Sequence, residues 1–348
     1  MIRLVQKKIP GLVNPYLIRL VVLLITIAFL VGCDNQSDAI FQIDVSNINV
    51  KYIPRDKGIA LNIPTYDGSN QAVHPDILPL ENIPGLFSKY KYLMAMTPYP
   101  NTMEQFENPS VIGSKNGLNF SNPANSINPL APTPIDGHNA DPDLIFDHRT
   151  RQFYLYYIES HAHIAQNVVL LTSTDLKNWT RQTIIQDPIN GNPRFIVSPT
   201  VIKDDEGLWY MYYVNANSRR LEYLTSEDGI SWDKDDVHLP EVNQSMSFSP
   251  WHADVFRDGS WYYVLSCGYT ENRNLFIGRS QDLVNWEFKS EPILTPLSSG
   301  LNCSWIYRSS GMVLDHDLYI YFSYVYSGNK WNIGVYRKKL SSIDFSSK

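Results

Sequence analysis

A short motif occurs four times in this chain: a serine, Asp or Asn two residues later, and an aromatic residue six positions after the serine. The copies begin at Ser114, Ser173, Ser226 and Ser280 and end at Phe120, Trp179, Trp232 and Trp286. Successive copies lie 59, 53 and 54 residues apart, a period that indicates a repeated supersecondary unit. Asp228-Gly229 and its counterpart in the first copy are hairpin dipeptides, because glycine accepts a positive φ. The motif therefore predicts a repeat protein with one such turn in each unit, and a closing aromatic that packs against the adjoining unit.

The strands expected around this turn also recur. Aromatic and β-branched runs predict one strand in each of five units, at residues 90–96, 153–157, 208–214, 261–265 and 318–323. A shorter apolar strand precedes each run, and these strands start at His74-Pro-Asp76, Asp141-Pro-Asp143, Ser198-Pro-Thr200, His252-Ala-Asp254 and Ser310-Gly-Met312. No segment after the N-terminal leader keeps helical periodicity for three turns. We therefore expect an all-β fold, a five-bladed β-propeller of four-stranded antiparallel blades.

The expected domain organisation has three parts. Residues 1–32 read as a lipoprotein signal peptide and are set apart from the fold. Residues 33–70 are expected to form a tether and an N-terminal strand that joins the last blade and closes the ring. Residues 71–340 hold the propeller itself.

The leader combines basic residues with an apolar run from Leu20 to Val31, which is shorter than the about 20 residues that a membrane span needs. It ends in Leu-Val-Gly-Cys33, which resembles a bacterial lipobox. The resemblance implies cleavage before Cys33, lipidation of that residue and a bacterial protein exported and anchored to the cell membrane. An uncleaved signal anchor is the alternative. Asp34 resembles an inner-membrane retention signal, which implies the periplasmic face if the cell has two membranes.

The amino-acid composition limits the classes of molecule that the protein is expected to bind. A net charge of −6 and the lack of a basic stripe outside the leader argue against nucleic acid. Aromatic residues make up 13% of the chain, which suits either a propeller core or stacking on sugar faces. Cys267 and Cys303 either pair across neighbouring units or stay independent thiols. Cysteine and histidine spacing indicates no zinc site, so no metal and no cofactor is predicted, and a structural or axial calcium ion cannot be derived. We expect a monomer.

The starts of the first strands supply the candidate chemistry. First strands line the axis of a propeller, and alternate side chains share a side of a strand. We therefore expect convergence on one central pocket of His74, Asp76, Asp141, Asp143, His252 and Asp254, with Arg308 nearby. Crowded carboxyl groups disfavour joint ionisation, so one pKa should rise, as glycoside hydrolysis requires of its acid. Asp76 and Asp143 have an alternative interpretation, since Asp beside Pro also caps turns.

The proline-marked first strand, the aromatic second strand and the Ser-x-Asp turn together resemble the five-bladed propeller glycosidases of the arabinanase, xylosidase, levansucrase and invertase clans. Glycoside hydrolase family 43 is the nearest, and the resemblance covers residues 71–340. It implies an acid where this chain has His74, and a glutamate before the third proline motif. This chain has Val197 and Ser198 there, and neither side chain can protonate a glycosidic oxygen.

Three substitutes for the missing acid are considered. Glu107 lies on a loop expected at the pocket face, Glu159 and His161 occupy the matching loop of the second unit, and His252 titrates near working pH. His161 reads more simply as a solvated loop residue. Asp141, Asp254, His252 and Glu107 are the catalytic candidates.

Substrate contacts are expected from the neighbouring residues. Three aromatic residues border the motifs and would stack on a sugar ring, namely Trp251, Trp305 and Tyr307. Four polar residues are further candidates for binding the substrate, namely His74, Asp76, Asp143 and Glu159. Arg308 either holds an acidic substrate group or pairs with Asp254. The leading hypothesis is a membrane-tethered glycoside hydrolase-like protein acting on a polysaccharide or oligosaccharide. The alternative is a non-catalytic carbohydrate-binding propeller that has lost its acid.

Overall fold

The computed structural model describes residues 48–345 except 81–82, 84–88, 162–164, 188–194, 243–245 and 270–272. The predicted signal peptide, Cys33 and the first part of the predicted tether, residues 33–47, lie outside these residues. Within the described ranges, no helix is both long and apolar enough to cross a membrane.

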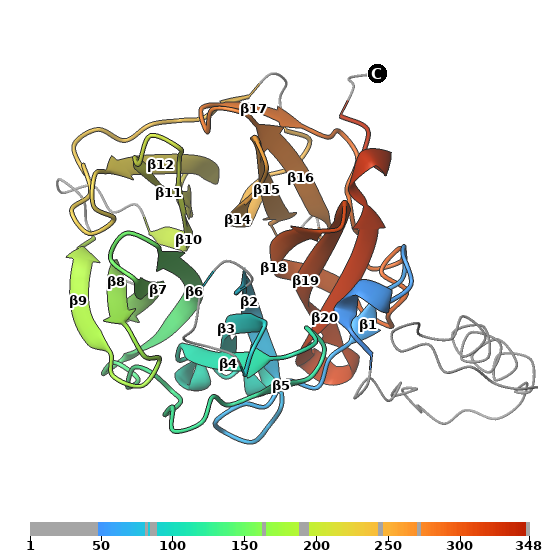
Figure 1. Ribbon diagram of the computed structural model, residues 1–348, viewed down its shortest axis with the longest axis horizontal. Helices are drawn as coiled ribbons and strands as arrows, with labels where there is room; N and C mark the ends of the chain where they lie inside the picture. The colour runs from blue at the N-terminus through green and yellow to red at the C-terminus, as the bar shows by residue number, and fades with distance from the viewer. Residues whose placement is uncertain are drawn as a thin grey trace, which may run out of the picture. The chain divides into compact units, whose positions relative to one another are not determined.

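Five antiparallel sheets stand around a common axis, which confirms the predicted all-β, five-bladed propeller (Figure 1). The first blade contains β2 (Ala72–Pro79), β3 (Tyr92–Pro98), β4 (Ser110–Ser114) and β5 (Phe120–Ser121). The second contains β6 (Gly137–Asp147), β7 (Gln152–His161), β8 (Ala165–Ser173) and β9 (Thr180–Ile185). The innermost strands β2, β6, β10, β14 and β18 contact one another in a closed cycle.

The third and fourth blades depart slightly from four strands, and the fifth takes its fourth strand from the N-terminal segment. The third has β10 (Ile196–Lys203), β11 (Trp209–Asn215) and β12 (Arg220–Ser226). The fourth has β14 (Pro250–Asp258), β15 (Trp261–Gly268), β16 (Leu275–Ser280) and β17 (Asn285–Phe288), plus a parallel edge strand β13 (Glu241–Val242). The fifth has β18 (Trp305–Leu314), β19 (Asp317–Tyr326) and β20 (Lys330–Lys339).

The N-terminal segment supplies the fourth strand of the last blade. Strand β1 (Ile59–Ala60) pairs antiparallel with β20 and so closes the ring. Ion pairs reinforce this short pairing, because Arg55 and Arg337 both reach the fully buried carboxylate of Asp317, at 2.9 and 2.5 Å. The ring is thus closed by residues from both ends of the described chain.

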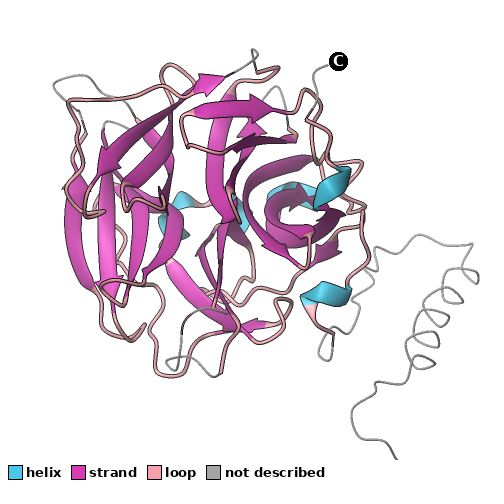
Figure 2. Cartoon of the chain, turned by 45° about the horizontal axis from the view of Figure 1, so that its top comes forward, coloured by secondary structure: helices cyan, strands magenta, loops and turns pink. Residues whose placement is uncertain are grey.

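In the part of the chain that the structure describes, helical structure is confined to single turns. These are the 3₁₀ turns η1 (Val50–Tyr52), η2 (Pro100–Thr102), η3 (Glu104–Phe106), η4 (Ser327–Asn329) and η5 (Leu340–Ser342). Figure 2 shows these turns as short helical segments in a chain whose regular structure is otherwise made of strands. Turns η2 and η3 lie in the loop after β3, which carries Glu107 to the site described below.

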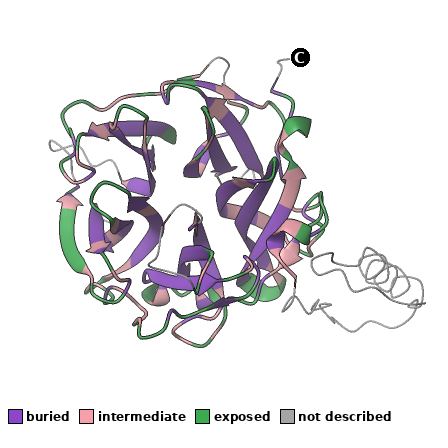
Figure 3. Cartoon of the chain, viewed as in Figure 1, coloured by how far each residue is buried: buried purple, intermediate pink, exposed green. Residues whose placement is uncertain are grey.

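The hydrophobic core lies between the blades. Five clusters of buried apolar residues each join the facing sides of two neighbouring sheets, so every blade is packed on both faces. Buried residues therefore line the inner strands all around the ring (Figure 3). Strand β9 faces outward, and four of its six residues are exposed. Cys267 and Cys303 are both free thiols, so the structure does not show the disulfide that the sequence left open.

The Ser-x-Asp turn has the local structure that its sequence predicts. In the third blade the Ser226 hydroxyl accepts hydrogen bonds from the backbone N–H of Asp228 and Gly229, at 3.3 and 3.0 Å. The carboxylate of Asp228 accepts from the next two backbone N–H groups. Gly229 has φ +74°, and its carbonyl accepts a 2.8 Å bond from Tyr156 of the preceding blade. The turn therefore joins neighbouring blades.

The aromatic residue that ends the motif also crosses to the preceding blade. Trp232 lies edge-on to Tyr156, Trp286 to Tyr212, and Phe120 to Tyr321 of the last blade. These contacts place the motif at blade interfaces and away from the axis, where the candidate chemistry lies.

Candidate functional site

The six axial candidates meet at the axis in two groups instead of one pocket. His74, Asp141 and His252 form the first group, and three more carboxylates form the second. Residues two apart on a strand share a side but are separated by about 6.5 Å along it. The prediction of a single convergent pocket was therefore wrong, because it took account of which side each residue faces but ignored its depth along the axis.

The first strands are irregular where the motifs begin. Register shifts separate Val73 from Asp76 in the first blade and Ala140 from Asp143 in the second, so each strand carries a β-bulge there. His74 and Asp141 lie inside these bulges with φ of +56° and +54°, a conformation rare for residues other than glycine. Bulges re-aim side chains. Here they bring the two side chains together across neighbouring blades.

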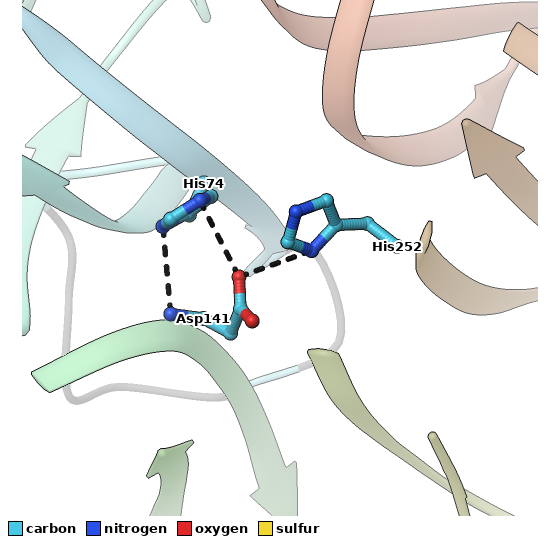
Figure 4. A group of neighbouring side chains, drawn as sticks. All are labelled: His74, Asp141 and His252. Atoms are coloured by element: carbon cyan, nitrogen blue, oxygen red, sulfur yellow. Dashed lines mark hydrogen bonds and ion pairs between the residues drawn. The ribbon is translucent and has the colours of Figure 1, made fainter. Parts of the chain in front are cut away.

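The three side chains of the first group, the His–Asp–His cluster, point at one another from three different blades (Figure 4). Asp141 Oδ1 lies 3.4 Å from His74 Nε2 and 3.3 Å from His252 Nδ1. Asp141 Oδ2 accepts a 2.9 Å hydrogen bond from the backbone N–H of Ser198, which orients the carboxylate. All three side chains are at least 95% buried. A carboxylate shared by two imidazoles therefore forms the centre of the site.

Burial and charge act against each other in this cluster. Burial lowers the pKa of His74 to about 3, although the carboxylate of Asp141 opposes that shift. Burial also raises the pKa of Asp141, but His252, His74 and the nearby guanidinium outweigh it and leave that pKa below its ordinary range. At neutral pH the cluster thus offers a carboxylate and an uncharged His74 imidazole.

The same cluster has the donor set of a transition-metal site. Asp141 Oδ1, His74 Nε2 and His252 Nδ1 are buried, lie within 4.8 Å of one another, and have no hydrogen-bond partner among the described residues. Two imidazoles and one carboxylate are ligands that zinc and other divalent transition metals accept. His74 Nδ1 lies 3.1 Å from Thr97 Oγ1 and also accepts the backbone N–H of Asp141 at 3.5 Å. With Nε2 on a metal, Nδ1 would carry the proton and donate to Thr97 instead, the kind of bond that orients a ligating histidine. The residues present therefore fit a divalent ion.

Glu107 and His138 flank the cluster on the first and second blades. Glu107 is 96% buried, with Oε1 3.6 Å from His74 Nδ1 and Oε2 3.7 Å from His138 Nε2. Burial and the charges of Asp141 and Glu104 raise the pKa of Glu107 well above its ordinary value. The loop position predicted for Glu107 on the pocket face thus brings it beside the cluster. His138 was missed by the sequence reasoning, and its place three residues before Asp141 was the only available signal.

The second group lies deeper along the axis and consists of Asp76, Asp143 and Asp254. Each carboxylate accepts a hydrogen bond from the backbone N–H of Leu144, Val201 or Gly311 on an adjacent blade. Burial, the largest cause, raises the pKa of all three, and the charge of Asp76 adds to this for Asp143 and Asp254. The bonds to Asp76 and Asp143 join neighbouring blades, whereas the alternative interpretation of these two residues expected caps of local turns. Asp254 belongs to this group and not to the group of His252.

Arg308 lies between the two groups and is fully buried. Its Nη1 donates a 2.8 Å hydrogen bond to the carbonyl of Pro142 and lies 3.9 Å from Asp141 Oδ1. The carboxylate within 4 Å is thus Asp141 and not Asp254, the partner considered from the sequence. The positive charge of this guanidinium therefore stabilises the negative charge of Asp141 in the first group.

Aromatic rings cover the fourth and fifth blades beside the His–Asp–His cluster. The Tyr307 ring lies edge-on to His252 with centroids 4.3 Å apart, and its hydroxyl accepts a 3.1 Å bond from Trp251 Nε1. Trp305 packs against the other side of Tyr307 at 5.2 Å. Tyr307, Trp251 and Trp305 are partly exposed, so the structure places all three predicted sugar contacts on one wall.

Two predicted polar residues have other partners. Glu159 forms ion pairs with Arg181 at 2.6 Å and with His161 at 3.0 Å, so it is already neutralised. On the third blade, Ser198 has φ +56° like its counterparts but donates its hydroxyl to the carbonyl of Ala253. The third blade therefore contributes hydrogen bonds to the site and no acid.

No protein-family model matches this chain. The A type blood N-acetyl-alpha-D-galactosamine deacetylase of Flavonifractor plautii is 27% identical over 297 residues, which cover 69% of this chain. The matched part spans about 37% of the length of that protein.

Crystal structures share the fold. An N-acetylgalactosamine deacetylase from F. plautii in complex with blood group B trisaccharide has a TM-score of 0.69 at 21% identity, covering 80% of this chain and 94% of that one. A thermostable family-43 glycoside hydrolase has a TM-score of 0.56 at 16% identity, over 77% of this chain and 89% of its own. The arabinanase of Bacillus subtilis has a TM-score of 0.55 at 11% identity, covering 82% of this chain and 97% of that one. The propeller is therefore shared with both kinds of carbohydrate-active enzyme.

Proposed function

We propose that this protein is a metal-dependent hydrolase that removes acetyl groups from N-acetylated amino sugars of a glycan. The observation that carries the proposal is the His–Asp–His cluster, whose facing atoms are buried without hydrogen-bond partners among the described residues. The similarity to a protein named as an N-acetylgalactosamine deacetylase supports the reaction class. The third blade lacks the acid that glycoside hydrolysis needs, which favours cleavage of an amide bond over a glycosidic one.

In this proposal His74, Asp141 and His252 hold a divalent ion. Such an ion supplies Lewis-acid chemistry, polarising the amide carbonyl and lowering the pKa of the attacking water. Asp141 is oriented by the Ser198 backbone N–H, and Arg308 supports its negative charge. The protein thus holds its anionic ligand in place before any ion arrives.

Glu107 is the proposed acid-base group. It contacts His74 Nδ1 and not the Nε2 proposed to hold the ion, so it is not a fourth member of the cluster, and its raised pKa suits it to proton transfer. It would take a proton from the attacking water and return one to the amine nitrogen as the C–N bond breaks. The products are acetate and a free amino sugar. His138, which links Glu107 to Glu104, would orient the Glu107 carboxyl group.

The test measures two products from the same reaction. A panel of N-acetylated oligosaccharides is incubated with the protein, and free acetate and new reducing ends are quantified in parallel. We expect acetate without new reducing ends, and loss of acetate release in Glu107→Gln. New reducing ends without acetate would contradict the proposal.

Glycoside hydrolysis is the second candidate, as the sequence resemblance implied, and one observation favours it. Glu107 and Asp141 contact opposite nitrogens of the His74 ring, and their pKa values are displaced in opposite directions. Such a pair can act as acid and base in glycosidases. In this case Glu107 would protonate the leaving oxygen and Asp141 would activate water. The same two-product experiment distinguishes the candidates.

We also propose that the propeller is tethered to the bacterial cell membrane through a lipid on Cys33. The lipobox-like Leu-Val-Gly-Cys run supports this, together with the basic and apolar leader. Metabolic labelling with a fatty-acid analogue should mark the wild-type protein and leave Cys33→Ser unlabelled. Labelling of both forms would contradict the proposed anchor.

A further inference from the structure

Two exposed arginines near the His–Asp–His cluster have no acidic partner. Among the described residues, Arg219 and Arg273 lie within 4 Å of no carboxylate, whereas many other arginines do. Arg219 belongs to the hairpin between β11 and β12, and Arg273 lies just before β16. Both therefore carry a positive charge that no carboxylate of the described residues offsets through an ion pair.

Each of these guanidinium groups is placed on an aromatic ring that leads to His252. Arg219 lies 3.6 Å from the centroid of Tyr269, whose ring packs against Trp251 at 4.9 Å. Trp251 in turn lies 5.8 Å from the His252 ring. A cation over an aromatic face is attracted to it. The Tyr269 ring therefore restrains the Arg219 guanidinium, whose N–H groups stay available to bind a ligand.

Arg273 is placed in the same way on the next blade. It lies 5.4 Å from Trp305, which contacts Tyr307, and the Tyr307 ring lies against His252. The backbone carbonyl of Arg273 accepts a hydrogen bond from Ile306, which ties this segment to β18. Two chains of the same kind, arginine then two aromatic rings, thus extend outward from one histidine of the cluster.

The acidic groups on the other side of the cluster are already engaged. Glu104 pairs with His138, and Glu159 pairs with Arg181. The face around the cluster therefore has an asymmetric charge, with free positive charge on the third and fourth blades. Guanidinium groups bind carboxylate and sulfate oxygens through paired hydrogen bonds.

From this placement we propose that the site takes an anionic glycan, in which a carboxylated or sulfated sugar lies next to the N-acetylated one and is bound by Arg219 and Arg273. The inference rests on the proposed function and adds to it the class of substrate. It also gives Trp305 a second role, because this ring holds Arg273 and is one of the three that would contact the sugar chain.

The experiment compares probes of equal length by calorimetry. The anionic probes are tetrasaccharides of hyaluronan and of chondroitin sulfate, and the neutral probe is a chitin tetrasaccharide. The variants are Arg219→Gln, Arg273→Gln and the double variant. Arg151→Gln is the matched control, since Arg151 is also exposed in a hairpin turn, has φ +57° against +54° for Arg219, and donates its backbone N–H to a strand end in the same way.

We expect wild type and Arg151→Gln to bind at least one anionic probe more tightly than the neutral one, and the double variant to lose about tenfold in affinity for it. Affinity for that probe should also fall as salt rises. Equal affinity for the anionic and neutral probes, no binding of an anionic probe, or unchanged affinity in the double variant would overturn the inference. Acetate release is measured separately, so a protein that selects anionic glycans but releases no acetate would contradict only the proposed function.

Discussion

At the scale of single residues, the proposed metal site depends most on Asp141. One of its oxygens faces both imidazoles of the cluster, and the other accepts the backbone N–H of Ser198. Asp141→Asn keeps the shape of the side chain but removes the charge. Because a divalent ion needs that charge, we expect metal affinity and acetate release to fall by at least about a hundredfold.

Metal titration followed by fluorescence or calorimetry measures this effect directly. The control is Asp205→Asn, which makes the same chemical change at an exposed carboxylate paired with Arg257. Full metal affinity in Asp141→Asn would show that the cluster is not the ion site.

Glu107 gives a second prediction at this scale. Glu107→Gln keeps the size and shape of the side chain beside His74 and His138 but cannot exchange a proton. We expect kcat for acetate release to fall by about 10²–10⁴-fold, the usual contribution of general acid-base catalysis, while bound metal stays at the wild-type level. Joint measurement of metal content and kcat separates these effects. Loss of metal together with activity would instead make Glu107 a ligand.

The sequence identified most residues of the site but not their arrangement. His74, Asp141, His252 and Glu107 were all selected from motif positions. The metal site could not be predicted, because its ligands come from three blades and have no local spacing, and the bulges that re-aim His74 and Asp141 are not visible in residue types. Asp254 was grouped with the others because alternation fixes the side of a strand and not the depth at which residues meet.

At the scale of elements, the Ser-x-Asp turns are predicted to contribute to stability. Asp228 accepts two backbone N–H groups at 2.7 Å. Asp228→Ala leaves them without this acceptor, and we expect a loss of about 1 kcal/mol in the free energy of unfolding, measured by denaturant titration. Glu227→Ala, at the exposed neighbouring position, is the control and should have little effect.

The pH dependence of this loss has a definite sign. Burial raises the pKa of Asp228, but the hydrogen bonds from Ser231 and Ile230 outweigh it and leave the pKa below its ordinary value of 3.8. A lowered pKa stabilises the folded protein above the unfolded pKa, and this stabilisation disappears as the pH falls through the folded pKa. The difference between wild type and Asp228→Ala should therefore shrink below about pH 4. A difference that grows on acidification would contradict this.

At the scale of the whole molecule, the ring depends on its closure. Two residues of β1 pair with β20, and the ion pair of Arg55 with Asp317 adds to the buried apolar contacts that the N-terminal segment makes with the last blade. Asp317→Ala leaves Arg55 and Arg337 without their shared acceptor, and we expect a loss of about 2–3 kcal/mol, less than for a fully buried pair because Arg55 is half exposed.

Thermal unfolding of the purified propeller measures this loss. Asp315→Asn, two residues away, removes an exposed ion pair with Lys51 and keeps a residue type that tolerates the φ of +51° at this position, so it should change stability by less than about 1 kcal/mol. Equal effects of the two substitutions would show that closure does not depend on Asp317.

The architecture was predictable because the repeat is periodic and each unit marks its own turn and aromatic strand. The smaller departures were not. Among the described residues the third blade has three strands, and β13 joins the fourth blade in parallel. Such edge strands are short and have no distinctive sequence pattern.

The most direct test of the central claim is the metal dependence of acetate release. The purified protein is stripped with a chelator, dialysed, and titrated with zinc, manganese or cobalt while acetate release from an N-acetylated oligosaccharide is followed. The account predicts that the stripped protein is inactive, that activity returns in proportion to one bound ion per chain, and that His252→Ala does not recover. Undiminished acetate release by the stripped protein would contradict it.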